Sequence, residues 1–252
     1  MPRARPGYKP TSAETWTAHA RAVSQYALDR LRGDLPAGLP VRGACNGIFL
    51  PFEVLEEAVA ACAAAHDLGK LQLRWQMWAS VAQKQRNPTY AHEAPLAHTD
   101  HDPESDDERV LRQALGIRRP PHASAGAYYS AFVLPSMLLL AKSAGLLEEV
   151  TSACIAAVLS HHGGWLTHES DLEVDYPCLG WTDCVASLGA SVDSDLVTSA
   201  LRRPGKKRQL DAVLSMTMSA DTFSRWWPLV SYLCRTLRLS DQRTTAEGGS
   251  NE

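Results

Sequence analysis

Seven histidine and aspartate side chains fall on, or directly beside, segments whose other residues are apolar. A buried carboxylate is costly unless a cation or hydrogen-bond donors surround it. A divalent metal ion meets that need, because a neutral imidazole supplies a nitrogen ligand and a carboxylate has two oxygens that can bridge two ions. We therefore predict a centre of two divalent ions bridged by Asp67. The metal-binding candidates are His19, His66, Asp67, His122, His161, His162 and Asp241.

Two metal ions roughly 3.5–4 Å apart hold a phosphodiester, lower the pKa of a bound water and stabilise the leaving oxygen. Lys70 follows Asp67 closely enough to stabilise charge on the phosphate. Ligation by several imidazoles favours Mn, Fe, Co or Ni, with Mg and Zn as alternatives. The chemistry that these residues predict is metal-dependent hydrolysis of a phosphate ester.

Helices must position the N-terminal half of this set, because apolar residues recur there at spacings of three and four. His19 lies on the apolar face of a helix predicted over residues 13–32. The His66–Asp67 pair ends a second, alanine-rich helix predicted over 55–65. We expect Gly69 to stop that helix.

The C-terminal half repeats the design. A helix predicted over 148–162 ends in two histidines followed by two glycines. Asp241 falls on the apolar stripe of a last helix predicted over 224–246, where a carboxylate is expensive. His122 opens a helical segment of small residues, which allow helix backbones to approach closely.

Each of these residues also has an ordinary structural explanation. His19 could be a core histidine hydrogen-bonded to a backbone carbonyl. The two histidines at 161–162 could merely complement the negative end of a helix dipole, and Asp241 could pair with Arg238 or Arg243. Two apolar helices that both end in metal-type residues and then glycine are harder to explain in this way, so we prefer metal binding.

The net charge and the motifs limit the possible functions. The 252 residues include 25 Lys and Arg against 28 Asp and Glu, which gives a net charge of −3. A protein that coats nucleic acid is usually basic, so a passive DNA-binding module is disfavoured. The one basic cluster, residues 202–208, is either a phosphate contact or a solvated loop. No GxxxxGK[ST] motif is present, so we expect no NTP-driven motor in this chain.

Segments that would direct the chain to a membrane are not expected. No apolar run reaches the roughly 20 residues that span a bilayer. No apolar signal-peptide core follows the basic N-terminus. The six cysteines show no CxxC pairing, and two of them lie in apolar helical runs. We therefore predict a reduced, cytoplasmic protein with no membrane segment.

An irregular stretch is expected over residues 86–121, which contains several prolines and an acidic run at 100–108. Three histidines in this stretch compete with His122 for the role of metal ligand. Because no helix is expected to orient them, we interpret the stretch as a solvated loop and expect the last two to be dispensable. They are His92, His98 and His101.

The ordered set of motifs resembles the HD phosphohydrolase superfamily. The HDLGK sequence at 66–70, the HHGG sequence at 161–164 and the late Leu-Ser-Asp at 239–241 look most like the HD nuclease domain of the CRISPR type I effector nuclease-helicase. The resemblance covers residues from about 15 to 245. The HD pair alone is a weak signal, whereas the full ordered set is specific.

The resemblance implies an all-α fold, an HD-superfamily helical bundle with a buried two-metal site. The nuclease domain would span 13–246, between a flexible arm at 1–12 and a disordered tail at 247–252. One ion would be held by residues matching His19, His66, Asp67 and Asp241, and the other by residues matching Asp67, His122, His161 and His162. Residues matching Asp67, Lys70 and Thr245 would support catalysis.

The resemblance also implies an activity and partners. It implies metal-dependent cleavage of single-stranded DNA in CRISPR interference, with a helicase that feeds the strand and a crRNA-guided complex that opens the target. Helicase motifs are absent from this sequence, which leaves a stand-alone subunit or a domain of a longer protein as alternatives. Two other functions compete: an HD nucleotide phosphohydrolase and a catalytically idle HD adaptor that docks a partner.

Overall fold

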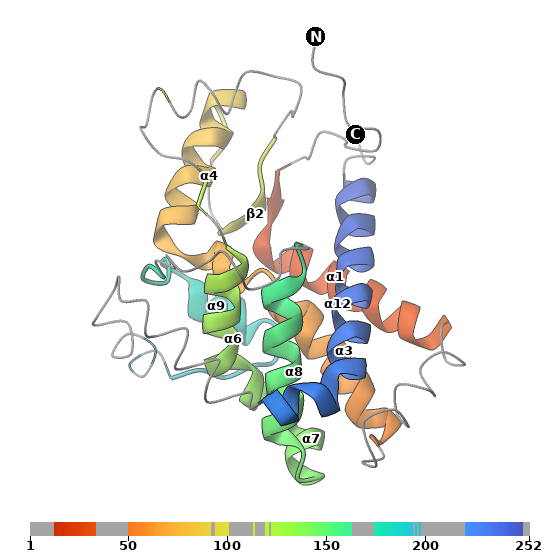
Figure 1. The fold of residues 1–252 in the computed structure, drawn as a ribbon. Coiled ribbons are helices and arrows are strands. Elements are labelled where there is room, and N and C mark those ends of the chain that lie inside the picture. Colours follow the sequence, from red (N-terminus) through yellow and green to blue (C-terminus); the bar gives the residue numbers. More distant parts are fainter. Residues whose placement is uncertain are drawn as a thin grey trace.

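The computed structural model describes residues 13–33, 50–91, 94–100, 122–162, 174–193 and 220–248, and the single residues 113, 119, 120, 195 and 197. Nearly all the elements in this part are helices, which confirms the predicted all-α class (Figure 1). In the same described part, none of the helices combines the length and apolarity needed to cross a bilayer. The elements are β1 (Glu14–Thr15), α1 (Trp16–Gly33), α3 (Phe52–Ala65), the 3-10 helix η1 (Leu68–Leu71), α4 (Leu73–Arg86), β2 (Leu96–His98), α6 (Ala123–Met137), α7 (Leu139–Ser143), α8 (Leu147–Ser160), α9 (Trp181–Ala186) and α12 (Ala220–Gly248).

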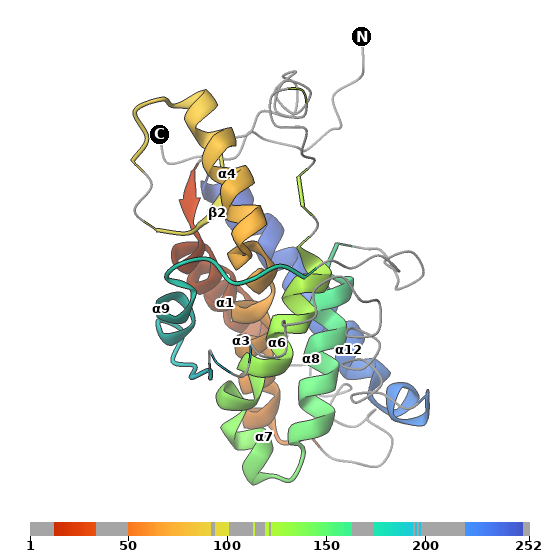
Figure 2. The same cartoon turned by 90° about the vertical axis from the view of Figure 1, so that its left-hand side faces the viewer.

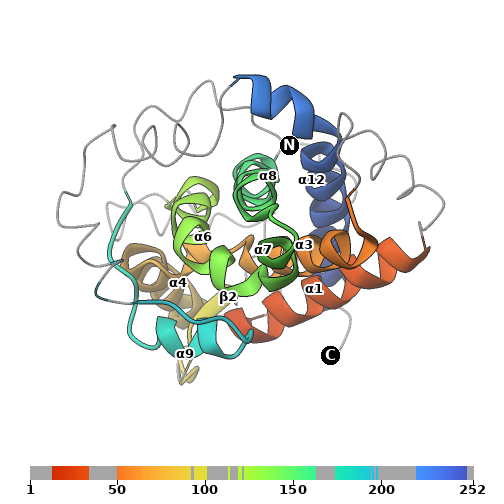
Figure 3. The same ribbon diagram turned by 90° about the horizontal axis from the view of Figure 1, so that it is seen from below.

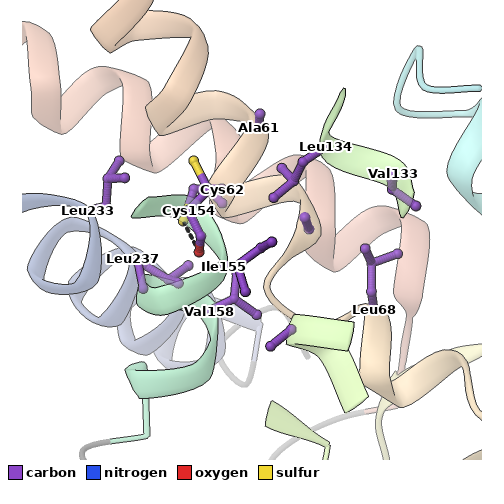
Figure 4. Packing of buried hydrophobic residues seen from close by; sticks show 14 of the residues in the cluster. Ala61, Cys62, Leu68, Val133, Leu134, Cys154, Ile155, Val158, Leu233 and Leu237 are labelled. Carbon is purple, nitrogen blue, oxygen red and sulfur yellow. Dashed lines mark hydrogen bonds between the residues drawn. The ribbon is translucent and has the colours of Figure 1, made fainter. Parts of the chain in front are cut away.

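The alanine-rich helix α3 lies at the centre of the bundle and packs against α1, α6, α8 and α12 (Figures 1 and 3). Its small side chains allow this, because they let neighbouring helices approach on several sides. Figure 4 shows Cys62 of α3 facing Cys154 of α8, with Leu233 and Leu237 of α12 alongside. The Cys62 Sγ lies 3.8 Å from the Cys154 carbonyl oxygen, so the cysteines serve here as small core residues.

The predicted helices are present, with shifted ends. The first begins at Trp16 instead of residue 13, because the residues before it pair as a strand. The last extends to Gly248, two residues into the predicted disordered tail. An ion pair of 2.8 Å between Arg243 Nε and Glu247 Oε1 supports that last turn, since residues four apart are neighbours on a helix.

A short β-ribbon corrects the expectation that residues 86–121 are wholly irregular. β1 and β2 pair antiparallel, with Glu14 opposite His98. The buried amide of Gln76 holds β2 in place: it donates to the Leu96 carbonyl at 2.8 Å and accepts from the Leu96 N–H at 2.9 Å. Three residues are too few to show the alternation by which strands are recognised in a sequence, so the pattern gave no signal.

The tryptophans of α4 are core residues. Trp75 and Trp78 are almost completely buried and form a small second cluster with Leu96 of β2. The segment 174–180 then crosses η1, with the Cys178 N–H donating to the Leu71 carbonyl at 2.7 Å. It leads into α9, which lies beside α1 (Figure 2), where Arg21 donates to the Ser187 carbonyl at 3.0 Å.

Gly69 has a different role from the one expected. Helix α3 ends at Ala65, and Gly69 lies within η1 without the positive φ of a helix-capping glycine. A Cβ at Gly69 would overlap the carbonyl oxygen of His122 and crowd the amide of Gly126 in α6. The expected close approach of small residues is thus confirmed, and it brings η1 against the start of α6.

Some expectations lie outside the described residues. These are the arm at 1–12, residues 249–252, His92, His101, the basic cluster at 202–208 and the acidic run after Asp100.

We predict that Gly69→Ala lowers the free energy of unfolding by about 2 kcal/mol, because overpacking against rigid backbone typically costs about 1–3 kcal/mol. Urea unfolding followed by circular dichroism measures the change. Gly33→Ala is the matched control, since a Cβ at Gly33 meets nothing within 4 Å. Equal stabilities of the two variants would contradict the close approach.

Candidate metal centre

The structure brings all seven predicted ligands to one place in the bundle. Each arrives from the end of an element or from a helix face turned toward the centre. They are His19 on α1, His66 and Asp67 after α3, His122 immediately before α6, His161 and His162 after α8, and Asp241 on α12.

The first group of ligands surrounds one oxygen of Asp67. The Nε2 atoms of His19 and His66 lie 3.4 and 3.3 Å from Asp67 Oδ2. Asp241 Oδ1 completes the group, 3.2 Å from His19 Nε2 and 3.7 Å from His66 Nε2. Four potential ligand atoms, supplied by α1, α12 and the turn after α3, thus converge.

The second group faces the other oxygen of the same carboxylate. His122 Nε2 lies 3.2 Å from Asp67 Oδ1, and His162 Nε2 lies 2.6 Å from His122 Nε2. The ring of His161 lies tilted by 42° against that of His162, with centroids 3.9 Å apart. Asp67 therefore stands between two groups of imidazoles, one on each oxygen.

Backbone carbonyls orient two of the imidazoles. The Nδ1 atom of His66 lies 2.7 Å from the Ala63 carbonyl, and His161 Nδ1 meets the Val158 carbonyl in the same way. A carbonyl oxygen only accepts, so Nδ1 must carry the proton in both rings. The Nε2 atoms of both rings are buried and lack a hydrogen bond. When each ring is neutral, that Nε2 atom therefore holds a free lone pair.

The backbone of Asp67 is fixed as well. Its carbonyl accepts from the Trp16 Nε1–H and from the Lys70 N–H, each at 2.8 Å. Both carboxylate oxygens of Asp67 are buried without a well-directed hydrogen bond, although several cations lie within ion-pair distance. Buried oxygens and imidazole nitrogens left in this state form a donor set that fits divalent metal ions.

The two predicted supporting residues differ in their contacts. Lys70 is buried, and its Nζ lies 2.6 Å from Asp67 Oδ2. Thr245 is half-buried on α12, and within the described part of the chain it makes no hydrogen bond to the ligand groups. The buried hydroxyl of that turn belongs to Thr244, which donates to the Ser240 carbonyl at 3.0 Å. The role predicted for Thr245 therefore stays a prediction.

The first group holds protons tightly. Burial opposes the cation of His19, but hydrogen bonds to carboxylates, led by Asp241, outweigh it and raise its pKa to about 10. Burial also disfavours the His66 cation, yet the charge of Asp67 leads the opposing effects and its pKa rises to about 9. Burial would raise the pKa of Asp67, but the cations His66 and Lys70 hold it well below its usual range.

The second group is neutral. Burial lowers the pKa of His122 to about 3, against the hydrogen bond to Asp67 that favours its cation. Burial, followed by the positive charge of His66, lowers the pKa of His161 to about 3. At neutral pH these imidazoles carry no competing proton and can act as ligands directly.

Two residues beside the site differ from expectation: Glu14 was not considered, and His98 was assigned to a solvated loop. His98 lies on β2 with its ring centroid 4.5 Å from that of His19, and its Nε2 is buried. It is therefore not in a solvated loop, because the β-ribbon orients it. Glu14 Oε2 lies 3.0 Å from His19 Nδ1. A helix from residue 13 would have turned Glu14 away from His19, so only a recognised strand would have revealed this pair.

A structural ion pair between Asp241 and Arg243 would have been the ordinary explanation for Asp241, and the structure does not support it. That guanidinium pairs with Glu247 at 2.8 Å, whereas Asp241 faces His19 and His66.

Residues 16–224 match the family model described as "Cas3, HD domain". Comparisons with curated proteins and with solved structures returned no match. The family match includes six of the seven converging residues and ends before Asp241. The placement of Asp241 in the site therefore rests on its contacts in the structure and not on the family match.

We predict that uptake of a divalent ion by the first group releases protons and strengthens as the pH rises from about 6 to about 9, because His19 and His66 must lose their protons to bind. Uptake by the second group should change little over that range. Calorimetric titration with Mn²⁺ in two buffers of different ionisation enthalpy measures proton release. His19→Ala should remove the pH-dependent event, and uptake without any proton release would contradict the assignment.

Proposed function

Because the chain belongs to the Cas3 HD-domain family, we propose that it is a metal-dependent nuclease that cuts single-stranded DNA in CRISPR interference. The family itself implies a metal-dependent nuclease role, and HD domains bind divalent metals. The preference for single strands, the residue roles and the partners are our proposal.

The observation that carries the proposal is the position of Asp67 between two groups of ligands. In this arrangement one carboxylate can bridge two ions, with His19, His66 and Asp241 on one side and the three remaining histidines on the other. Two bound ions supply an activated water and neutralise charge on a phosphodiester. Imidazole-rich ligation favours Mn, Fe, Co or Ni, with Mg and Zn as alternatives.

The residues around the two ions would have separate roles in positioning the ligands and neutralising charge. Asp67 orients both groups through its fixed backbone, and buried carbonyls hold His66 and His161 with their Nε2 atoms free. The Lys70 ammonium neutralises Asp67 in the absence of metal, and it is close enough to interact with a phosphate bound to the ions. We keep the proposal that Thr245, which lies on the same helix as Asp241, supports catalysis.

The exposed edge of the site supports a thin substrate. His162 is exposed and the Asp241 side chain is 21% exposed, whereas the other ligands are buried. We therefore expect a phosphate to approach on the side of His162 and Asp241. A single strand can bend into such an opening more easily than a stiff duplex. With a net charge of −3, the chain has no excess positive charge to hold a duplex.

The partners follow from this restriction. A nuclease that requires single strands needs an ATP-driven helicase to supply them and a crRNA-guided complex to open the target. We propose both as partners of this chain, whether the helicase is a separate protein or part of the same one.

We predict that Asp67→Asn reduces bound metal and lowers DNA cleavage by at least about 100-fold, because the bridge serves both ions. Metal content and cleavage of circular single-stranded DNA are the measurements. Asp29→Asn, at an exposed position on α1, is the matched control. Undiminished cleavage by Asp67→Asn would end the two-ion proposal.

Loss of stability must be separated from loss of metal in this experiment. Asp67→Asn leaves the buried Lys70 cation without its partner, and breaking a buried pair costs about 3–5 kcal/mol. The double variant Asp67→Asn with Lys70→Met removes both charges. It should fold like the native chain in circular dichroism and still bind little metal.

We also predict that the metal-loaded chain alone cuts circular single-stranded DNA and leaves blunt linear duplex nearly intact. Gel assays with both substrates at equal nucleotide concentration test this access argument. Equal cleavage of the two substrates would refute it.

The competing functions give different results in the same assay. Hydrolysis of free nucleotides in preference to DNA would identify a nucleotide phosphohydrolase. A chain that binds no metal and cuts neither substrate would be an idle adaptor.

A further inference from the structure

His19 differs from the other buried imidazoles in its place on the helix. His66 and His161 are the C-cap residues of α3 and α8. His19 is the fourth residue of α1, close to the N-terminal end of that helix. The three rings nevertheless all turn Nε2 toward the site, where, among the described residues, each of these atoms is buried without a well-directed hydrogen bond.

The direction of the helix decides which backbone groups can orient a ring. The last turn of a helix has carbonyl oxygens without helical partners, and the first turn has N–H groups without them. His66 and His161 donate from Nδ1 to carbonyls of their own last turns, those of Ala63 and Val158. The first turn of α1 has no such free acceptor for His19.

An N–H donor from the first turn would have the wrong effect. If Nδ1 of His19 accepted a hydrogen bond, a neutral ring would carry its proton on Nε2. That proton would point at Asp67 and Asp241, and Nε2 could not bind a metal. His19 therefore requires an acceptor that does not belong to its own helix.

Glu14 provides that acceptor. Its Oε2 lies 3.0 Å from His19 Nδ1, and a carboxylate can only accept. The β-ribbon fixes Glu14 in this position: Glu14 pairs with His98, and the flanking Trp16 N–H donates to the Pro95 carbonyl at 2.7 Å. The Ala13 N–H donates to Asp100 Oδ1 at 2.7 Å and anchors the other side.

We propose that Glu14 is the positioning residue of the first ligand group, accepting the Nδ1 proton of His19 so that the Nε2 lone pair faces the metal between Asp67 and Asp241. Its negative charge, one imidazole away from the ion, also strengthens metal binding. This inference rests on the proposed two-ion function. It gives the β-ribbon a role, which is to hold Glu14 beside the N-terminal end of α1.

Two substitutions separate the hydrogen bond from the charge. Glu14→Ala removes both, and Glu14→Gln keeps an acceptor oxygen without the charge. Glu14 is 23% exposed, so both variants should fold. Glu56→Gln is the matched control, because Glu56 forms an exposed pair with Arg32 at 2.9 Å, away from the site.

The first measurement is metal affinity, by titration of the metal-free variants with Mn²⁺. Loss of a partner that orients a ligand typically costs about 10- to 100-fold in metal affinity. We expect a loss of this size for one ion in Glu14→Ala, a smaller loss in Glu14→Gln, and none in Glu56→Gln. Glu14→Ala with an affinity within about twofold of the control would overturn the proposal.

The second measurement is the position of the proton on His19, by nitrogen NMR of the zinc-loaded chain. A proton on Nδ1, with Nε2 bound to zinc, is expected in the native chain and in Glu14→Gln, whereas Glu14→Ala should show a larger share of rings with the proton on Nε2 and no zinc. A proton on Nε2 in the native chain would overturn the proposal.

His19→Ala distinguishes this failure from failure of the proposed function. If His19→Ala loses the same ion while Glu14→Ala binds it normally, the metal centre stands and only the role of Glu14 is wrong. If neither the native chain nor His19→Ala binds metal, the two-ion function is wrong and the role of Glu14 falls with it.

Discussion

A carboxylate almost completely removed from water must be surrounded by cations or donors, and Asp67 meets this condition with groups drawn from several helices. Lys70 and the protonated rings of His19 and His66 compensate its charge on one oxygen. His122 approaches the other. The close contact of η1 with α6 at Gly69 and the central place of α3 both bring these groups to the carboxylate.

The imidazoles on the two sides of Asp67 differ in their protonation. On the first, a bound ion would replace protons that the carboxylate neighbours of His19 and His66 stabilise. On the second, burial lowers the pKa values of His122 and His161, so that both rings are already neutral. A single buried charge thus separates a pH-sensitive half of the site from a pH-insensitive one.

Much of this site could be predicted from the sequence, because helical periodicity exposes a polar residue on an apolar face. Asp241 and His19 were recognised in this way, and the structure places both beside Asp67. Glu14 was missed and His98 was assigned to a loop, because a ribbon of two and three residues has no detectable period. Gly69 was recognised as special for the wrong reason, since a sequence does not distinguish a glycine needed for a turn from one needed for close contact.

The share of α12 in the site has a consequence for the newly made protein. Asp241 is the last ligand along the chain, more than two hundred residues after His19, and it closes the first group. Chains are synthesised from the N-terminus, and a domain generally folds as a unit. The first group therefore stays incomplete until α12 has emerged from the ribosome. A nascent or truncated chain without α12 would lack one residue of the proposed metal site while it is still close to the nucleic acids of translation.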